Sequence, residues 1–317
     1  MAFPEVDLGV VILAYGTSRR FETLLRSVLD SGVGPTSIAL VQNPSAPGEP
    51  VLKPSDPRIA VLRLHRNLGY AGGMNEGIRH HTARGAQQLL LLTHDVRLRA
   101  GTLEALLAAS AEHPSAGILG PVLYDAKTGA PFSFGVHRTR SGGLVHLDRP
   151  PLERALEHGV VGCDSIDGAA MLIRKEVLDR TGVFADHFFM YFEESDLCLR
   201  TARAGWQVGI VPVAEAEQEV GASSRPGAWG YLMARNGLAY ARSAAGALGV
   251  AGGLGRFARD VAIHFLLVLR PSTSRTARPV HWLTLRGMAR GVVDYFLGRW
   301  GPPPPSLAGL GDVTGTN

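Results

Sequence analysis

The first half of the chain alternates short apolar runs with helical stretches, and this alternation constrains the fold more than any other feature. LGVVILAY at residues 8–15, SIALVQN at 37–43 and IAVLRLHRN at 59–67 have the length and the aliphatic content of strands. AQQLLLLTHDV at residues 86–96 contains an unbroken apolar run, which is typical of a strand covered on both faces. Strands that alternate with helices predict an α/β fold with a mostly parallel, doubly wound central sheet and helices on both faces.

The rest of the chain divides by its composition. Residues 126–159 are rich in Gly, Pro, Arg and His, which predicts loops and a β-ribbon, and residues 164–184 read as a strand, a helix and a turn. Past Gly227 the pattern is helical until the four prolines at 302–305, which end regular structure. The organisation that we expect is an α/β domain over residues 1–235, with halves of about 1–125 and 126–235, a helical extension over 236–300, and a disordered tail over 301–317.

Composition and charge narrow the classes of protein. A hydrophobic share of 45% in 317 residues can form a sizeable core, so we expect a globular protein. The net charge of +4 favours an anionic partner, but the basic residues are scattered, so we expect no nucleic acid. Cys163 and Cys198 lie in apolar sequence without a second pair, and we interpret them as buried thiols. We find neither a signal peptide nor an apolar run of about 20 residues, and therefore expect a cytoplasmic protein.

In a parallel sheet, ligands bind beyond the carboxyl ends of the strands. The strand exits to inspect are residues 14–17, 42–45, 67–75 and 93–95. The third of them, within NLGYAGGMNEGI, places several glycines at the start of a helix, where free N–H groups can face an anion; a purely structural turn remains the alternative. Asp95 at the last exit is either a ligand of a cation that holds phosphate oxygens or a helix cap.

The segment FFMYFEESDLCLR places acids among bulky apolar residues. The spacing of Glu193, Asp196 and Arg200 predicts a salt-linked helix stripe that faces solvent. Glu194 differs, because it follows an apolar approach at the expected helix start. Partial burial there would raise its pKa from about 4.3 and let it accept a proton from an attacking hydroxyl.

An ordered set of motifs makes the sequence resemble a known family. The set is VVILAYG, VQNPS, NLGYAGGMNEG, LLTHDV, DGAAMLIRKEVLDRTGVFADHFFMYFEESDLCLR, AGWQVGIVP and YLMARN. Together these motifs, over about residues 8–236, resemble the inverting glycosyltransferases of family 2, especially the rhamnosyltransferase-like branch. The resemblance implies a GT-A fold, a nucleotide-diphosphate sugar donor and a single displacement at the anomeric carbon.

The resemblance also implies roles for individual residues. Glu194 matches the general base, and Asp95 matches the acid that contacts the donor's diphosphate and its divalent cation, Mg²⁺ or Mn²⁺. Asp167, Gly168 and Glu193 would border the sugar or the acceptor. The residues expected to bind the donor's nucleoside and phosphates are Ala14, Tyr15, Gly16, Gln42, Asn67, Gly69, Gly73, Asn75, His94, Asp95 and Arg235.

The sequence departs from the family's pattern at three positions. Gln42 replaces an Asp that commonly contacts the donor's nucleobase, and this affects the choice between a dTDP-linked and a UDP-linked donor. Gly16 replaces an Asn at the end of the first strand, a loss that looks minor. Gln218 replaces a His that commonly contacts the metal or the diphosphate, which weakens the case for a cation. Without an ion, Arg225 and Arg235 are the nearby groups that could neutralise the diphosphate.

The C-terminal helices carry arginines next to apolar faces. Three interpretations stay open: packing onto the catalytic domain, peripheral contact with an anionic membrane at its inner face, and pairing of two subunits. The acceptor is expected to be a cell-surface polysaccharide or lipid-linked glycan, or else a small natural product. The alternatives to an active transferase are a non-catalytic sugar-nucleotide binding protein and a nucleotidyltransferase with a similar sheet. The arginines next to the apolar faces of the C-terminal helices are Arg256, Arg259, Arg270, Arg275, Arg278, Arg286, Arg290 and Arg299.

Overall fold

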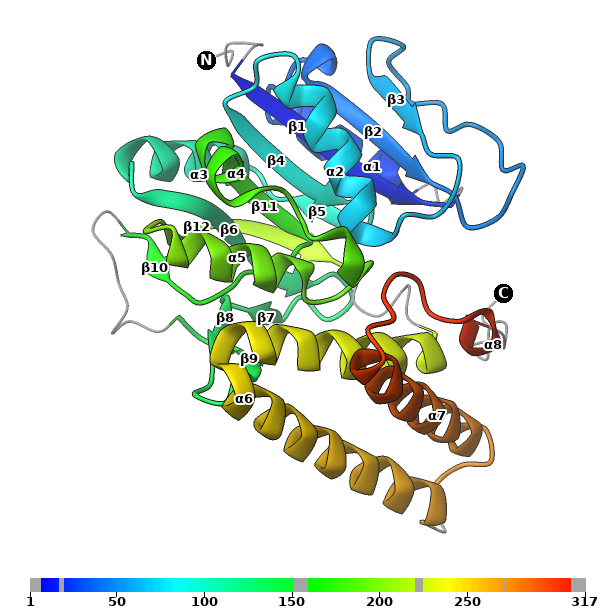
Figure 1. Cartoon of the computed structure of the whole chain (residues 1–317). Helices are drawn as coiled ribbons and strands as arrows, with labels where there is room; N and C mark the ends of the chain where they lie inside the picture. The colour runs from blue at the N-terminus through cyan, green and yellow to red at the C-terminus, as the bar shows by residue number, and fades with distance from the viewer. Residues whose placement is uncertain (1–6, 17–19, 151–158, 220–224, 271, 309–317) are drawn as a thin grey trace. The chain divides into compact units, whose positions relative to one another are not determined.

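The computed structural model describes residues 7–16, 20–150, 159–219, 225–270 and 272–308 (Figure 1). The chain forms two compact units. The first is the α/β unit, formed by residues 1–137, 144–186 and 193–220. The second is the C-terminal unit, formed by residues 138–143, 187–192 and 221–317. The expected domain boundary at residue 235 falls inside a helix of the C-terminal unit.

The α/β unit is built on one ten-stranded sheet, whose main path runs β10-β12-β6-β11-β4-β1-β2-β3. The strands β4, β1, β2 and β3 are parallel, and β11 lies antiparallel between β4 and β6. β5 pairs with β12 and β7 with β6, and β8 and β9 form a separate ribbon. The strands are β1 (Leu8–Tyr15), β2 (Ile38–Asn43), β3 (Ala60–Arg63), β4 (Gln88–Thr93), β5 (Val96–Leu98), β6 (Ala116–Asp125), β7 (Pro131–Ser133), β8 (Val136–Arg138), β9 (Leu144–His146), β10 (Val161–Gly162), β11 (Ala170–Arg174) and β12 (Gln207–Gln218).

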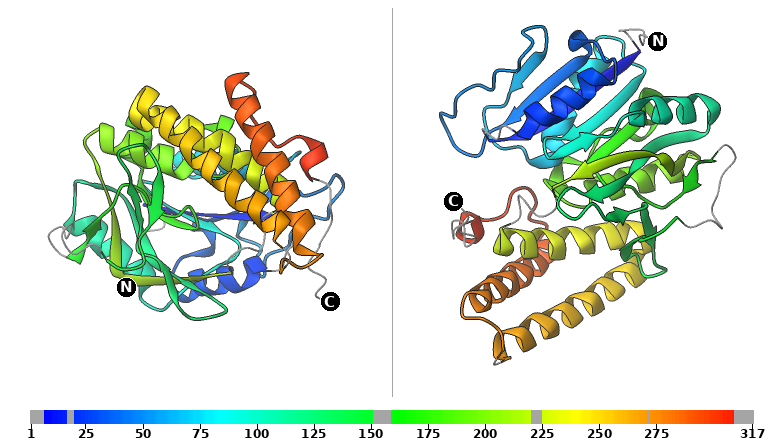
Figure 2. Two further views of the ribbon diagram at one scale, coloured as in Figure 1. Left: turned by 90° about the horizontal axis from the view of Figure 1, so that it is seen from below. Right: turned by 180° about the vertical axis from the view of Figure 1, so that it is seen from behind.

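Helices cover both faces of this sheet, as the alternation in the sequence predicts (Figure 2). Val10 and Ile12 of β1 share a core with the helix that carries Leu24. Val11 and Leu13 point to the other face, in a second core. The helices of this unit are α1 (Arg20–Asp30), α2 (Gly69–Thr82), α3 (Thr102–Glu112), α4 (Lys175–Thr181) and α5 (Glu193–Arg203), with the short 3₁₀ turn η1 (Pro35–Ser37). A second 3₁₀ turn, η4 (Asp186–Phe188), begins at the last residue before the chain enters the C-terminal unit.

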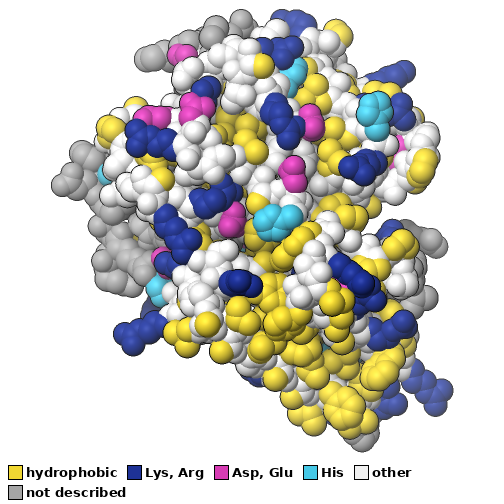
Figure 3. Space-filling view, in the orientation of Figure 1, with side chains coloured by type: hydrophobic (Ala, Val, Ile, Leu, Met, Phe, Trp, Pro, Cys, Tyr) yellow, Lys and Arg dark blue, Asp and Glu magenta, His cyan; other side chains and the backbone are white. Residues whose placement is uncertain are grey.

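The C-terminal unit is a helical hairpin. It contains α6 (Pro226–Leu269), α7 (Ala277–Phe296) and the short α8 (Pro305–Ala308). α6 is kinked where Ala245 and Gly246 leave helical geometry. A Cβ on Gly287 would lie 2.0 Å from the Gly227 carbonyl oxygen, so glycine lets α7 approach α6 closely. Apolar side chains gather over these helices (Figure 3).

Part of the expected disordered tail is ordered. Residues 301–308 are described, and Leu307 of α8 packs in a small core with Phe189, Tyr231 and Leu232. Residues 309–317 lie outside the described part of the chain. Within the described ranges, no helix has the length and apolarity that crossing a membrane requires.

Candidate active site

The carboxyl ends of the parallel strands bring several of the predicted residues to one edge of the sheet. Tyr15 pairs with Asn43 across β1 and β2, and Leu13 pairs with Thr93 across β1 and β4. The Thr93 amide donates to the carbonyl of Ala169 at 3.0 Å. Because β11 runs antiparallel to β4, the residues ahead of it, Asp167 and Gly168, reach the same edge as His94 and Asp95. The topology therefore gathers the predicted strand-exit residues at one edge of the sheet.

Two adjacent carboxyl groups begin α5 in unusual environments. Glu193 is only 3% exposed, and its Oε2 has no hydrogen-bond partner among the described residues. Burial, and then the charge of Glu194, raises the pKa of Glu193 well above its ordinary value, which favours the protonated form. Burial is also the main cause that raises the pKa of Glu194 to about 7, and the charge of Asp167 contributes. A carboxylate with such a pKa can accept a proton at neutral pH.

Asp167 joins this pair from a different part of the chain. Its Oδ2 accepts a short hydrogen bond from the Ser133 hydroxyl on β7, and its Oδ1 lies 3.6 Å from His146 Nδ1 on β9. The Ser165 hydroxyl, two residues earlier, donates to the Ser195 hydroxyl at 3.0 Å, directly after Glu194. The segment before β11 is thus connected both to α5 and to the β7 and β9 region. Sequence reasoning did not identify Ser133 or His146, which lie in the region of weak periodicity.

Tyr70 is a further residue that the sequence analysis missed. Its hydroxyl donates to the Gly168 carbonyl at 2.6 Å, which ties the start of α2 to the acceptor-side segment. Burial is the main cause that raises the pKa of the Tyr70 hydroxyl, and the charge of Glu194 adds to it, so the hydroxyl stays a neutral donor. The signal available in the sequence was a tyrosine inside the glycine-rich stretch.

Asp95 stands at the exit of β4 with one oxygen unused. Its Oδ2 accepts from the Gln218 side-chain amide at 3.3 Å, whereas Oδ1 is buried without a partner in the described chain. The Glu219 amide donates to the Asp95 carbonyl at 3.1 Å, and Gln218 pairs with Val96. The two positions that the resemblance assigns to the cation therefore contact each other.

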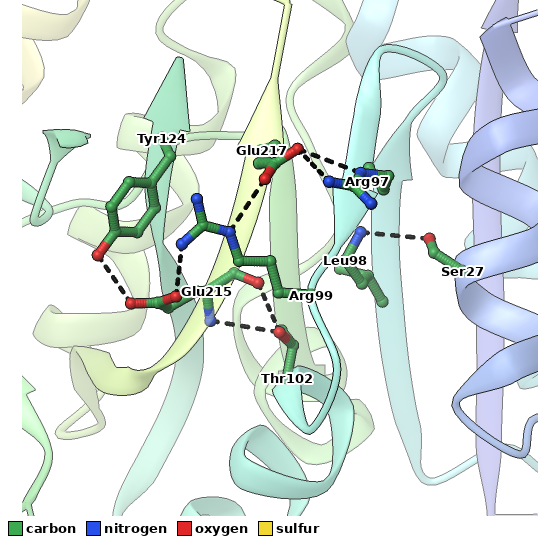
Figure 4. Close-up of polar contacts among 8 residues, drawn as sticks. All are labelled: Ser27, Arg97, Leu98, Arg99, Thr102, Tyr124, Glu215 and Glu217. Carbon is green, nitrogen blue, oxygen red and sulfur yellow. Dashed lines mark hydrogen bonds and ion pairs between the residues drawn. The ribbon is translucent and has the colours of Figure 1, made fainter. Parts of the chain in front are cut away.

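A ladder of ion pairs fixes the strand that follows Asp95 (Figure 4). Arg97 pairs with Glu217 at 2.6 Å, and Arg99 pairs with Glu217 at 3.1 Å and with Glu215 at 2.6 Å. The Tyr124 hydroxyl donates to Glu215 at 2.7 Å. Partly exposed pairs contribute about 0.2–1 kcal/mol each, so the network matters mainly by holding β5 in register on β12. That register keeps Asp95 beside Gln218.

The glycine-rich loop is organised by Asn43, a residue of the VQNPS motif that the sequence analysis did not select. The Asn43 side chain donates to Asn67 Oδ1 and to the Gly69 carbonyl, both at 3.0 Å, and accepts from the Leu68 amide at 2.9 Å. Gly69 has a φ of 71°, in the region that favours glycine. Gly16 also has a positive φ, 66°, and its amide donates to the Asn43 carbonyl at 2.9 Å.

Several predicted donor residues lie in the packed interior. The Gln42 side chain is 1% exposed, donates to the Pro50 carbonyl and accepts from the Leu52 amide, so it holds a loop. Asn75 is fully buried and bonds to Phe184 through both its oxygen and its nitrogen. A Cβ on Gly73 would lie 2.5 Å from Leu13 Cδ1, which makes this glycine a packing requirement. Ala14 is buried in the core, whereas Tyr15 is 38% exposed at the strand exit.

The predicted stripe of charged residues on α5 forms its ion pair, but it does not face solvent. Arg200 Nε pairs with Asp196 Oδ2 at 2.8 Å, as the spacing predicts. However, Asp196 is only 9% exposed and Glu193 is buried, so the expectation that the stripe faces solvent was wrong. The Arg200 guanidinium also donates to the carbonyls of Thr181 and Val183, which anchors α5 to the turn after α4.

Arg235 lies in the C-terminal unit and is fully buried. Its guanidinium donates to the carbonyls of Phe188 and Gly301 and to the Asn236 side chain, at 3.1, 2.8 and 2.9 Å. The amide of Asn236 donates in turn to the carbonyls of Phe188, Met190 and Tyr191 at 2.9–3.0 Å. This placement favours a structural role for Arg235 rather than the predicted contact with the donor.

These bonds hold a strained segment. Phe189, Tyr191 and Phe192 have φ values of 67°, 71° and 72°, which are unfavourable for bulky side chains. The segment ends at Phe192, which directly precedes Glu193 in the chain. The sequence did not predict its backbone conformation.

Comparison with known proteins places this arrangement in a family. The model of the family described as glycosyltransferase like family 2 matches residues 4–237. The chain is 28% identical over 228 residues to an N-acetylglucosaminyl-diphospho-decaprenol L-rhamnosyltransferase of Mycobacterium tuberculosis, and the match covers 66% of this chain and 74% of that protein. It is 24% identical over 172 residues to the dTDP-rhamnosyl transferase RfbF of Shigella flexneri, with 53% and 54% covered.

A solved structure shares the fold. The crystal structure of GalNAc-T7 with UDP, GalNAc and Mn²⁺ matches with a TM-score of 0.52 at 14% identity, over 71% of this chain and 48% of that one. At this identity the likeness shows the fold alone, which is GT-A, as the resemblance implied. Since the family model matches most of the sequence, the chain belongs to glycosyltransferase-like family 2 and is a glycosyltransferase similar to rhamnosyltransferases.

Proposed function

We propose that this glycosyltransferase moves its sugar from a nucleotide-diphosphate donor to an acceptor hydroxyl with inversion, and that Glu194 is the general base. The observation that carries the proposal is the carboxyl of Glu194, whose pKa is raised to about 7 beside Asp167 at the acceptor-side segment. Contacts along the chain support its place near the expected donor site: the charge of Asp167 acts on Glu194, and Asp167 precedes Ala169, whose carbonyl accepts from the amide of Thr93, two residues before Asp95.

The reaction is a single displacement. Glu194 takes the proton of the acceptor hydroxyl while the hydroxyl oxygen attacks the anomeric carbon. The bond from that carbon to the diphosphate oxygen breaks, and the electron pair leaves with the nucleoside diphosphate on the opposite face of the sugar. Attack opposite to departure inverts the configuration. Glu193, in its protonated form, adds no second negative charge beside the base.

The donor side fits a divalent cation in part. The unused Oδ1 of Asp95 and, after an amide flip, the carbonyl oxygen of Gln218 are the oxygen ligands that Mg²⁺ or Mn²⁺ accepts together with phosphates and water. When bound, such an ion would neutralise charge on the departing diphosphate. Among the residues that the structure describes, no group of three or more His, Cys, Asp and Glu could hold a metal, so the donor's phosphates and water would complete the coordination.

The identity of the substrates is drawn from the relatives. We infer a dTDP- or UDP-linked donor, with rhamnose as the favoured sugar, because the two similar proteins are named for rhamnosyl transfer. A lipid-linked glycan or polysaccharide is favoured as acceptor over a small natural product, since one relative is named for a diphospho-decaprenol acceptor. For the C-terminal helices, peripheral contact with the inner face of a membrane and pairing of two chains are the two alternatives to packing onto the catalytic domain.

Ligand-induced stabilisation tests the donor assignment. UDP or dTDP is expected to raise the unfolding midpoint, since a ligand at 100 times its Kd stabilises by about 2.7 kcal/mol. Mg²⁺ or Mn²⁺ should enlarge the shift in the natural protein but not in Asp95→Asn. The measurement is a thermal-shift series with and without each ion. If nucleoside diphosphate shifts the midpoint equally with and without each ion, the cation site is rejected but donor binding is not. If no nucleoside diphosphate shifts the midpoint, donor binding itself is rejected.

The pH dependence of transfer tests the base. Only ionised Glu194 can accept the proton, so kcat/KM should rise with pH through about 7 and then level off. Asp167→Asn removes a negative charge that raises this pKa, so the midpoint of the profile should move to lower pH whatever the loss in rate. Initial rates across the pH range with each variant measure both effects. A midpoint that stays in place in Asp167→Asn would contradict the proposed coupling.

A further inference from the structure

The distal half of the C-terminal hairpin exposes large apolar side chains. Six of them, which we call the hairpin patch, are between 48 and 64% exposed. Five lie on α6 after its kink and one on α7, so the patch belongs to a single unit. The side chains are Leu248, Ile263, Phe265, Leu266, Leu269 and Trp282.

Around this patch the charge is of one sign. Residues 242–300 contain nine Arg and two Asp, with no Lys or Glu, giving a net charge of +7 in a chain whose net charge is +4. Both acids are neutralised: Asp260 pairs with Arg259 at 2.8 Å, and the buried Asp294 pairs with Arg290 at 2.9 Å. Arg270 and Arg275 are exposed near the end of α6. Lys and Arg side chains border the apolar area in Figure 3.

We propose that the hairpin patch and its arginines bind the surface of an anionic phospholipid bilayer. Apolar side chains can enter the boundary between headgroups and acyl chains while guanidinium groups stay at the phosphates. The apolar run at 261–269 is about 13 Å long as a helix, so it cannot span a core of about 30 Å. The binding is therefore peripheral. It rests on this surface alone and does not depend on the proposed chemistry.

Charge argues against a second copy of the chain as the occupant. A symmetric contact would bring together two copies of a segment of net charge +7, whose two acids, Asp260 and Asp294, are already paired with arginines of the same segment. An anionic bilayer offers the opposite charge at its headgroups, directly beside the apolar phase of its acyl chains.

Vesicle flotation tests the proposal with the full chain and without donor or acceptor. The protein should float with vesicles of equal parts phosphatidylcholine and phosphatidylglycerol, stay behind with phosphatidylcholine alone, and dissociate as salt is raised. Phe265→Ser with Leu266→Ser, and separately Arg270→Gln with Arg275→Gln, should each weaken binding about tenfold or more.

A matched control removes the same charge elsewhere. Arg58 and Arg79 are exposed arginines of the α/β unit, and Arg58→Gln with Arg79→Gln should leave vesicle binding unchanged. Thermal unfolding of each variant shows that it is folded. The proposal is overturned if this control loses binding as much as the hairpin variants, or if neutral vesicles bind equally well. It also fails if the serine variant dissociates a dimer while its vesicle binding stays intact.

Discussion

Replacing Glu194 by glutamine is expected to lower the kcat of sugar transfer by about 10²–10⁴-fold, the usual contribution of a positioned general base. Glutamine keeps the size and much of the polarity of the side chain but cannot take a proton. Because the residues expected to bind the donor do not include Glu194, the shift of the unfolding midpoint by nucleoside diphosphate should remain. Initial rates with donor and acceptor, together with that thermal shift, separate loss of chemistry from loss of binding.

The neighbouring carboxyl is the matched control. Glu193 is buried and favours its protonated form, so Glu193→Gln replaces one neutral group by another of the same shape and should cost far less activity. Hydrolysis of the donor by water gives a second measurement that needs no acceptor. If Glu194→Gln transfers sugar at the natural rate, Glu194 is not the base. If natural protein binds donor yet transfers nothing to any acceptor, the non-catalytic alternative is favoured instead.

The place of the candidate site in the fold could be predicted, because topology fixes where the strand exits lie. Once the runs ending at Tyr15, Asn43 and Thr93 are recognised as parallel strands, their carboxyl ends must meet at one edge. Position along the chain also indicated that Glu194 begins a helix after an apolar approach, and α5 begins at Glu193. These inferences needed only periodicity and the sense of the strands.

The roles of individual polar side chains could not be predicted, because each role depends on the hydrogen-bond partner that the side chain has in the fold. Gln42 looked like a nucleobase contact, yet its amide is used by Pro50 and Leu52, while its neighbour Asn43 orders the glycine-rich loop. Two adjacent amides in one strand point to opposite faces, and the sequence does not say which face has the ligand. The burial of Asp196 escaped notice for a similar reason, since a charged residue with a nearby arginine ordinarily lies at the surface.

The largest loss of stability is expected at Asn236. Its amide donates to three carbonyls of the segment that contains Phe189, Tyr191 and Phe192, whose left-handed backbone would otherwise relax. Arg235 still donates to the Phe188 carbonyl, so Asn236→Ala removes the side-chain donor of the Met190 and Tyr191 carbonyls. A buried carbonyl left without a donor costs about 1–3 kcal/mol, so the free energy of unfolding of the C-terminal unit should fall by about 2–6 kcal/mol. Phe192 directly precedes Glu193 at the start of α5. Relaxation of the strained backbone should therefore lower kcat as well.

Asn236→Asp separates the two roles of this amide. The aspartate retains an oxygen for the Arg235 Nε–H, which Asn236 accepts at 2.9 Å, but has no N–H for the three carbonyls. If those donor bonds stabilise the segment, urea unfolding will find the aspartate variant about as unstable as the alanine variant. Recovery of natural stability in Asn236→Asp would instead assign the effect to Arg235. In that case the strained backbone before Glu193 would be maintained by the guanidinium bond to Phe188 rather than by Asn236.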